Sequence, residues 1–382
     1  MNIGFDAKRA YQNTTGLGHY SRTLIASLAQ YFPQYQYYLF APKTTSLFNT
    51  ENFSNVHAVE PSSFPSTLFK SAWRSNCVKK DLLKNNINIY HGLSHEIPLG
   101  IQNTGIKSVV TIHDLIFERY PEQYSKIDVQ IYRKKFMYAC KHADKIIAIS
   151  NQTKQDIIDY YKIPGEKITI CYQSSNPAFF HKVSAEEKQR IKAQYNLPEQ
   201  FYLYVGSVIE RKNLLTICKA IKELNNPVPL VVIGNGDGYM QKVKSYVAAN
   251  NLQQKIIFLS ETEAAKNSEA FKTAKDFPAI YQNALAMIYP SIFEGFGIPV
   301  LEAIASGLPT ITSNISCLPE AGGDAALYVN PTSVEEMKQA MQEIISNTAL
   351  RNTLIEKGIP HAQKFTQQAC AATVMNVYNS LL

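Results

Sequence analysis

The chain has 382 residues, of which 45% are hydrophobic and 18% are charged, and this balance is typical of folded globular proteins and excludes extended disorder. Its length suffices for two domains of ordinary size. It contains no apolar run near the roughly 18 residues of a membrane span, and its first residues lack the basic and apolar regions of a signal peptide.

The six cysteines are scattered without a C-x-x-C pair, which argues against a zinc site and suits a reducing cytosol. We therefore expect a cytoplasmic protein. The net charge is +7, and residues 1–180 hold 20 basic and 13 acidic side chains, whereas residues 181–382 hold 18 of each. This asymmetry suggests that a nucleic acid, an anionic membrane or an acidic ligand faces the N-terminal half. No nucleic-acid motif accompanies it.

Short apolar strands alternate with amphipathic helices in two series. After a strand-like start, the first series has strands expected at 37–40, 87–90, 109–112, 145–149 and 168–171. A charged helix expected at 185–195 precedes the second series, at 201–205, 230–233, 256–259, 286–289 and 310–312. Such alternation predicts parallel sheets with helices on both faces, and two series predict an α/β protein with two doubly wound, Rossmann-like domains.

We place an N-terminal domain at residues 1–180 and a C-terminal domain at residues 181–361. Residues 362–382 are expected to form a helix that packs back on the N-terminal domain. Ligands of open α/β sheets bind at the carboxyl ends of the strands, so two facing domains would hold the site in the cleft between them.

The first motif is Gly16-Leu17-Gly18, which precedes a helix expected at 23–30. Two glycines before a helix could let the backbone approach a phosphate or a sugar, although an ordinary glycine loop explains the same pattern. His113 and Asp114 follow the strand expected at 109–112. A single histidine at a strand end is more often structural than catalytic.

Arg211 and Lys212 follow the strand at 201–205 and directly precede a helix. Together they could clamp a diphosphate, because Arg offers a planar fork and Lys a compact charge. A solvated pair of cations is the alternative. The glycine-rich segment at 234–238 follows the next strand and lacks full G-x-G-x-x-G spacing, so we interpret it as a turn.

The most informative segment runs from Glu294 to Glu302, with a Gly-Phe-Gly turn and Pro299 between the two acids. The glycines let the backbone turn sharply, and Pro299 suits the first turn of a helix. Glu302 then lies near a helix start that favours an anion. A purely structural role, in which the acids support the helix dipole, explains these residues equally well when they are taken alone. No D-x-D sequence occurs, which weakens any mechanism that uses a bound metal to neutralise a leaving diphosphate.

These motifs, in this order, resemble the retaining glycosyltransferases of family 4, which have the GT-B fold. The resemblance covers nearly the whole chain. It rests on the Gly-Leu-Gly segment, Thr-Ile-His-Asp, the Arg-Lys-Asn segment that ends at residue 213, Glu-x7-Glu and the Leu-Pro-Glu-Ala-Gly-Gly-Asp segment from residue 318. Residues 288–307, IYPSIFEGFGIPVLEAIASG, are its most specific part.

The resemblance implies roles for individual residues. Lys212, together with Arg211, would contact the donor diphosphate. Glu294 would lie near the transferred sugar, and Glu302 would hold the ribose hydroxyls. The remaining implied donor contacts are the backbone at Phe296, Gly297 and Ile298, the phosphate-covering loop with Gly16 and Gly18, and His113 against the donor sugar.

Many relatives carry Arg directly after the position of Gly206, where this chain has Ser207. Arg211 would then supply the missing charge. The implied reaction moves a glycosyl group from a nucleoside-diphosphate sugar to an acceptor hydroxyl with retention, without a metal or other cofactor. Such enzymes are generally thought to use front-face attack, in which the departing phosphate takes the acceptor proton. Glu294 is therefore not expected to be a nucleophile.

The subfamily most resembled contains bacterial polysaccharide mannosyltransferases. This implies GDP-mannose as donor and a saccharide or lipid-linked saccharide of a surface polysaccharide as acceptor. A UDP-sugar-dependent transferase is the alternative, and a nucleotide-sugar 2-epimerase, a non-catalytic nucleotide-sugar-binding subunit and a dehydrogenase are weaker ones.

Two basic helices could rest on anionic lipid at the inner face of the plasma membrane. One is expected at 69–85 and carries Lys70, Trp73 and Arg74; the other carries Arg133 and its basic neighbours. Solvated helix faces are an equally good explanation.

Overall fold

The structure is a computed structural model that describes residues 1–61, 72–225 and 227–382. It divides into two compact units, unit 1 with residues 1–174 and 365–382, and unit 2 with residues 175–364. The first boundary precedes the expected one at 180/181 because Phe179 packs against Tyr281 of unit 2, with ring centroids 5.0 Å apart.

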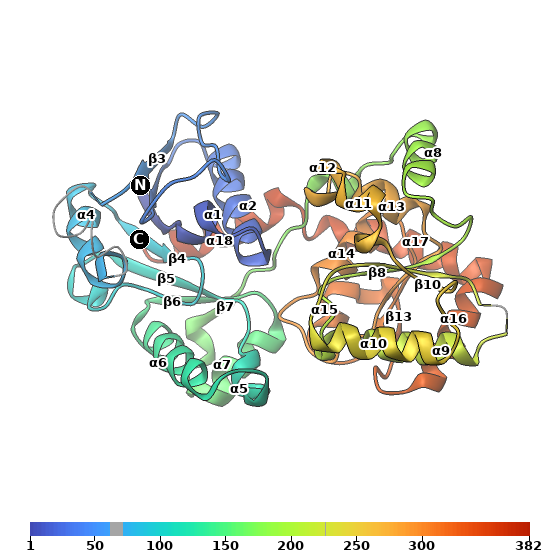
Figure 1. Ribbon diagram of the computed structural model, residues 1–382. Helices are drawn as coiled ribbons and strands as arrows, with labels where there is room; N and C mark the ends of the chain where they lie inside the picture. Colours follow the sequence, from blue (N-terminus) through green and yellow to red (C-terminus); the bar gives the residue numbers. More distant parts are fainter. Residues whose placement is uncertain (62–71, 226) are drawn as a thin grey trace. The chain divides into compact units, whose positions relative to one another are not determined.

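Unit 1 contains a parallel sheet in the order β3-β2-β1-β4-β5-β6-β7 (Figure 1). Its strands are β1 (Asn2–Asp6), β2 (Gln36–Phe40), β3 (Val56–Val59), β4 (Ile89–Gly92), β5 (Lys107–Ile112), β6 (Lys145–Ala148) and β7 (Ile168–Ile170). Its helices are α1 (Lys8–Gln12), α2 (Gly16–Tyr31), α4 (Val78–Lys84), α5 (Ile116–Arg119), α6 (Lys126–His142), α7 (Asn151–Tyr161) and α18 (Gln367–Asn379). Shorter helical turns are η1 (Trp73–Cys77), η2 (Ile101–Asn103), η3 (Pro121–Gln123) and η4 (Gly165–Lys167).

Helices cover both faces of this sheet, as apolar parallel strands require. One face packs against α1, α2 and α18, and the other against α4, α6 and α7 (Figure 1). The C-terminal helix α18 lies against α2 and contributes Val374 and Tyr378 to the first of these cores. The last helix of the chain therefore belongs to unit 1.

Unit 2 contains a second parallel sheet, in the order β10-β9-β8-β11-β12-β13. Its strands are β8 (Tyr202–Val205), β9 (Leu230–Ile233), β10 (Ile256–Phe258), β11 (Ala286–Tyr289), β12 (Thr310–Ser313) and β13 (Ala326–Val329). Its helices are α8 (Ala185–Gln194), α9 (Leu214–Glu223), α10 (Gly238–Ala249), α11 (Glu263–Lys266), α12 (Glu269–Lys272), α13 (Phe277–Asn283), α14 (Ile298–Ala305), α15 (Leu318–Gly322), α16 (Val334–Ser346) and α17 (Thr348–Gln363). Its shorter turns are η5 (Pro177–Phe180), η6 (Glu210–Lys212), η7 (Leu259–Glu261) and η8 (Gly323–Ala325).

The main core of unit 2 lies where α9, α10 and α16 pack on one face of the sheet (Figure 1). Leu230 and Ile288 of the strands meet Ile217 and Met337 of the helices in this core, and all four are almost fully buried. The two doubly wound domains expected from the sequence are therefore present. Among the described residues, none of the helices is long and apolar enough to cross a membrane.

Candidate active site

The order of the strands in unit 2 reverses between β8 and β11, which are neighbours in the sheet although β9 and β10 lie between them in sequence. In open α/β sheets the ligand binds at this reversal, beyond the carboxyl ends of the strands. Arg211 and Lys212 follow β8 in the turn η6, and Glu294 follows β11. The fold alone therefore brings the two predicted cations and the first predicted acid to one place.

Glycine makes room for Lys212. Gly206 directly follows β8 with φ +148°, and a Cβ atom there would lie 2.9 Å from Lys212 Nζ. Gly234 directly follows β9, and its Cβ would lie 1.9 Å from the backbone oxygen of Gly206. The loops after β8 and β9 are further joined by the Val208 N–H, which donates to the Asn235 oxygen at 2.8 Å. The segment at 234–238, which was expected to be a turn, thus packs against the loop that carries Arg211 and Lys212.

The Glu294 carboxylate collects four polar partners on one oxygen. Arg211 NH1 lies 3.0 Å and Lys212 Nζ 3.9 Å from Oε1. The Tyr289 and Ser291 hydroxyls each donate to the same Oε1 at 2.9 Å. Arg211 also donates to the backbone oxygen of Phe293, so its guanidinium is tied to the segment that carries the acid.

The charges of this cluster follow from these contacts. Burial by itself would raise the pKa of Glu294, but Lys212, Arg211 and the two hydroxyls outweigh it and lower the pKa below its usual value. Burial lowers the pKa of Lys212, and Arg211 adds to this effect while Glu294 opposes it. The three side chains are only 11–15% exposed, so two cations and one anion lie in a largely desolvated place with a surplus of positive charge.

The Gly-Phe-Gly turn leads into α14 as the sequence predicts. Gly297 is the N-cap residue with φ +107°, and its Cβ would lie 2.8 Å from Leu318 Cδ2, so only glycine fits there. Ile298 opens the helix and Pro299 lies in its first turn. The Phe296 side chain, in the middle of the turn, is buried. The positive end of α14 therefore begins just beyond Glu294, where an anion is favoured.

Glu302 lies on the second turn of α14 and does not contact the cations. The Tyr281 hydroxyl of α13 donates to its Oε2 at 3.1 Å. Burial raises the pKa of Glu302 to about 7, although this hydrogen bond favours the ionised form. The two acids of Glu-x7-Glu thus differ in kind: Glu294 is ionised by its partners, and Glu302 titrates near neutral pH.

The expected glycine loop of unit 1 is wrong in its boundaries. The helix α2 begins at Gly16, not at residue 23, so Gly16 and Gly18 lie in its first turn. Asn13 Oδ1 accepts from the Thr15 N–H at 2.9 Å and the Gly18 N–H at 3.1 Å, which allows the helix to start early. A Cβ on Gly18 would lie 1.9 Å from the Asn13 backbone oxygen, so this glycine is needed for that close approach.

His113 lies in unit 1, directly after β5. Its Nε2 is 2.9 Å from the Leu93 oxygen, and its Nδ1 is 2.8 Å from Gln173 Nε2. These partners fix the tautomer with the proton on Nε2. Burial lowers the pKa of His113 to about 4, so the ring is neutral near pH 7 and both of its nitrogens are engaged.

Sequence reasoning missed the residues that support Glu294. Tyr289 ends β11 and Ser291 lies three positions before Glu294, so the IYPSIFE segment already held the signal. Ser316 was also missed, and its Oγ accepts from the Glu294 N–H at 3.2 Å. In the described ranges, no group of three His, Cys, Asp or Glu residues could hold a metal ion.

The two doubly wound sheets and their strand order are those of the GT-B fold. Residues 14–177 match the family described as "Glycosyltransferase Family 4", and residues 185–360 match the one described as "Glycosyl transferases group 1". Since these two domains follow one another over most of its length, the chain belongs to the glycosyltransferases, as its motifs predict.

Two of its relatives act in O-antigen synthesis by name. The O-antigen chain mannosyltransferase B of Escherichia coli is 26% identical over 298 residues, which cover 77% of this chain and 74% of that protein. The O-antigen chain mannosyltransferase RfbU of Salmonella typhimurium is 30% identical over 251 residues, which cover 65% of this chain and 63% of RfbU. A glycosyltransferase structure from Rickettsia africae has the same fold, with a TM-score of 0.74, 18% identity and coverage of 99% of this chain and 98% of that one.

Proposed function

We propose that this glycosyltransferase moves a mannosyl group from GDP-mannose to a saccharide or lipid-linked saccharide acceptor in surface-polysaccharide biosynthesis, with retention of anomeric configuration. The cluster of Arg211, Lys212 and Glu294 beyond β8 and β11 carries the proposal. The names of the two O-antigen relatives support mannose as the transferred sugar.

The leaving group of the reaction is a nucleoside diphosphate, whose negative charge grows as the glycosidic bond breaks. Lys212 and Arg211 would stabilise that charge, since they are held in place before the reaction and are largely desolvated. The first turn of α14, at Gly297 and Ile298, would add backbone N–H groups. These residues replace a metal ion in the proposed mechanism.

Glu294 would orient the transferred sugar through its carboxylate. Its Oε1 already carries two hydroxyl donors and two cations, and such contacts reduce the nucleophilicity of an oxygen. This supports an orienting role rather than attack on the sugar. Glu302 would accept hydrogen bonds from the ribose hydroxyls in its ionised form, so donor binding and the ionisation of Glu302 would be linked.

From unit 1, we propose that Gly16 and Gly18 bring the first turn of α2 to the donor phosphates, in place of the loop first expected. His113 would contact the donor sugar as a neutral ring, because burial lowers its pKa to about 4 and the ring is therefore uncharged near pH 7. These roles remain predictions that rest on the family resemblance.

A thermal-shift screen with GDP-, UDP-, ADP- and TDP-sugars tests the donor, because a ligand that binds the folded state stabilises it by mass action. GDP-mannose should raise Tm most. A shift with a UDP-sugar and none with GDP-mannose would establish the UDP-sugar-dependent alternative instead. Incubation with donor alone, followed by analysis of the sugar, separates the transferase from a 2-epimerase, which needs no acceptor.

We also propose that unit 1 contacts an anionic membrane through α6. Exposed apolar side chains lie one turn apart on this helix, with Ile127 71% and Ile131 44% exposed. Lys126 and Lys134 beside them are exposed and form no ion pair in the described residues. Apolar side chains among cations are typical of helices that lie in the membrane interface.

The other basic helix is a poorer candidate. Lys70 and the first residues expected in it lie outside the described residues. Trp73 is buried and its Nε1 donates to Asp81 Oδ2 at 2.6 Å, while Arg74 pairs with Asp6 at 2.6 Å. Its only tryptophan therefore faces the protein, and the expectation that it could anchor this helix in lipid is wrong.

Sedimentation with vesicles tests the contact of α6. Binding to anionic vesicles should fall with added salt, and it should be lost in the Ile127→Glu, Ile131→Glu double variant. Absence of binding at low salt would remove the membrane from the account.

A further inference from the structure

Unit 2 contains a cavity of about 720 Å³ at the edge of the sheet opposite the candidate active site. Leu285 lines it directly before β11 begins, and Leu308 and Pro309 line it directly before β12. The cluster around Glu294 lies beyond the other ends of these strands. The volume lies within the roughly 300–1,000 Å³ of ordinary small-molecule sites.

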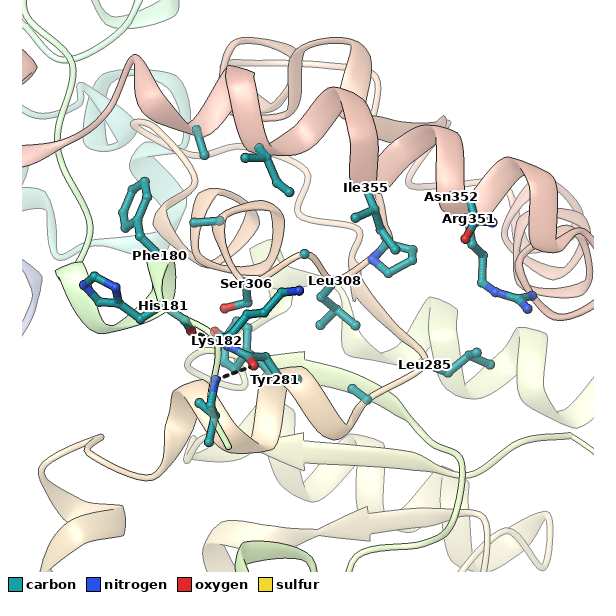
Figure 2. A pocket seen from close by; sticks show the side chains of 18 of the residues that line it. Phe180, His181, Lys182, Tyr281, Leu285, Ser306, Leu308, Arg351, Asn352 and Ile355 are labelled. Carbon is teal, nitrogen blue, oxygen red and sulfur yellow. Dashed lines mark hydrogen bonds between the residues drawn. The ribbon is translucent and has the colours of Figure 1, made fainter. Parts of the chain in front are cut away.

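The walls of this cavity come from four parts of unit 2 (Figure 2). The segment before α8 contributes Lys182, α13 contributes Tyr281, the residue after α14 is Ser306, and α17 contributes Asn352 and Ile355. The side chains of Tyr281, Leu285, Leu308, Ile355 and Ile359 make an apolar wall. The lining includes Lys182, Lys188 and Arg351 but no Asp or Glu, so the cavity combines an apolar body with positive charge.

Two of these cations have no acidic partner among the described residues. Lys182 and Lys188 form no ion pair in the described part of the chain, although α8 carries other cations that do. On the same helix Arg190 pairs with Glu187 at 2.6 Å, and Lys192 pairs with Glu199. Among the described residues, the two lysines that line the cavity are therefore not neutralised by an acid.

Arg351 contributes charge in a different way. Its guanidinium donates to the Ile345 oxygen at 2.9 Å and to Thr348 Oγ1 at 2.8 Å, and also to the Ile344 oxygen. It therefore closes the end of α16 and is not available to wrap a ligand. Its positive charge still lies at the wall of the cavity.

The segment with Lys182 is fixed in place by Gln282. Gln282 Nε2 donates to the His181 oxygen at 2.7 Å, and its Oε1 accepts from the Val183 N–H at 2.9 Å (Figure 2). Lys188 lies near the same support, because its backbone oxygen accepts from Asn283 Nδ2 at 3.0 Å. Both lysines are therefore carried by backbone that is ordered before any ligand arrives, which lowers the cost of binding.

We propose that this cavity binds an organic phosphate monoester. A phosphate monoester carries about −1.5 to −2 charges at pH 7, which matches the two unpaired lysines. Its organic body would lie against Leu308 and Ile355, with Ser306 and Asn352 available for polar groups on that body. The inference is independent of the donor and of the reaction at the other edge of the sheet.

Titration of the whole protein with a hexose 6-phosphate and with a nucleoside 5′-monophosphate tests the proposal, with inorganic phosphate and a neutral hexose as comparisons. Calorimetry gives the affinity, and spectra of isoleucine δ1-methyl groups give the place. At least one ester should bind saturably and shift the methyl signals of Ile355 and Ile359. The neutral hexose should bind at least tenfold more weakly than the ester.

The Lys182→Glu, Lys188→Glu double variant should bind the ester at least tenfold more weakly. The matched control is the Lys219→Glu, Lys275→Glu double variant, which changes the net charge equally at two exposed lysines of unit 2 and should bind normally. Equal loss in both variants, or inorganic phosphate binding as tightly as the esters, would overturn the proposal. So would an ester that shifts other methyl signals and leaves Ile355 and Ile359 unchanged, or no saturable binding of either ester.

Discussion

Two pairs of neighbouring strands, one pair in each sheet, end in chemically different side chains. Beyond β8 and β11 of unit 2, Arg211 and Lys212 face the ionised Glu294. At the carboxyl ends of β4 and β5 in unit 1 lie two buried histidines, His91 and His113. Burial lowers the pKa of His91 to about 3 and that of His113 to about 4, so both are neutral near pH 7.

The ends of β8 and β11 therefore offer charge, whereas the ends of β4 and β5 offer these uncharged rings. A charged pair lies at the end of the neighbouring β1, where Asp6 pairs with Arg74. Hydrogen bonds explain why the histidines can stay neutral, since the two nitrogens of His91 meet the Tyr378 hydroxyl at 2.6 Å and Thr111 Oγ1 at 2.8 Å. A diphosphate needs cations, whereas a sugar ring needs polar contacts without charge. From this difference we infer that unit 2 binds the anionic part of the donor. Four substitutions, two of which act on turnover and two on stability, test the difference between the two units.

The largest expected effect is that of Lys212→Ala. Loss of a preorganised group that stabilises a developing anion typically lowers kcat by about 10²–10³-fold. We expect a loss of this size in transfer, or in donor hydrolysis when water is the acceptor. Lys219→Ala, at an exposed lysine on the following helix, is the control and should turn over normally. Near-normal turnover of Lys212→Ala would remove this lysine from the mechanism.

Glu294→Gln should lower turnover by about 10²-fold, because the amide keeps the size but misplaces the sugar and the two cations. Circular dichroism checks that the variant still folds. A second variant, Glu294→Ala, distinguishes an orienting acid from a nucleophile, because added azide can take the place of a missing nucleophile. If Glu294 only orients the sugar, azide should neither restore turnover nor form a glycosyl azide. Formation of that product would show that a nucleophile had been removed.

Glu302→Gln should change the pH dependence of stability. The folded pKa of about 7 lies above the unfolded value of 4.5, so the wild-type loses stability as pH rises from 4.5 through 7. This loss amounts to about 3 kcal/mol at pH 8. Glutamine does not ionise, so this loss is absent from the variant. The free energy of unfolding of unit 2, measured in urea, should therefore depend less on pH in the variant than in the wild-type. The exposed Glu263→Gln serves as control, and an unchanged pH profile in Glu302→Gln would contradict the account.

His113→Gln should have the smallest effect of the four changes, and this effect is on the pH dependence of the stability of unit 1. The pKa of His113 is lowered on folding, so stability is lost as pH falls through the unfolded value of 6.5 toward 4. This cost is about 2 kcal/mol at pH 5. Trp73 is the only tryptophan and lies buried in unit 1, so its fluorescence reports this unfolding. The loss between pH 7 and pH 5 should be about 2 kcal/mol smaller in the variant; an equal loss would mean that His113 is not held neutral.

The sequence predicted most strands because parallel strands buried on both faces form continuous apolar runs. It missed β3 and β13, which are outer strands of their sheets. His57 interrupts the apolar run of β3, whereas β13 is a run of four apolar residues that the sequence interpretation overlooked. It also placed the start of α2 seven residues late, because the Asn13 side chain caps the helix and glycines are poor helix formers by propensity.

At the site, sequence spacing showed that Arg211, Lys212 and Glu294 follow strands, and the sheet order then brought them together. Their mutual contacts and the support from Tyr289 depend on side-chain packing, which spacing does not encode. The raised pKa of Glu302 depends on burial against α13, which also required the fold. The basic cavity was not predicted, because its lining is spread over residues 180–363.

The central claim is that the cations beyond β8 bind the diphosphate of the donor. Calorimetric titration of GDP-mannose into the wild-type, Lys212→Ala and Lys219→Ala proteins tests it most directly. The account predicts that Kd rises at least tenfold in Lys212→Ala and stays unchanged in Lys219→Ala. Equal affinity of all three proteins for GDP-mannose would contradict the claim.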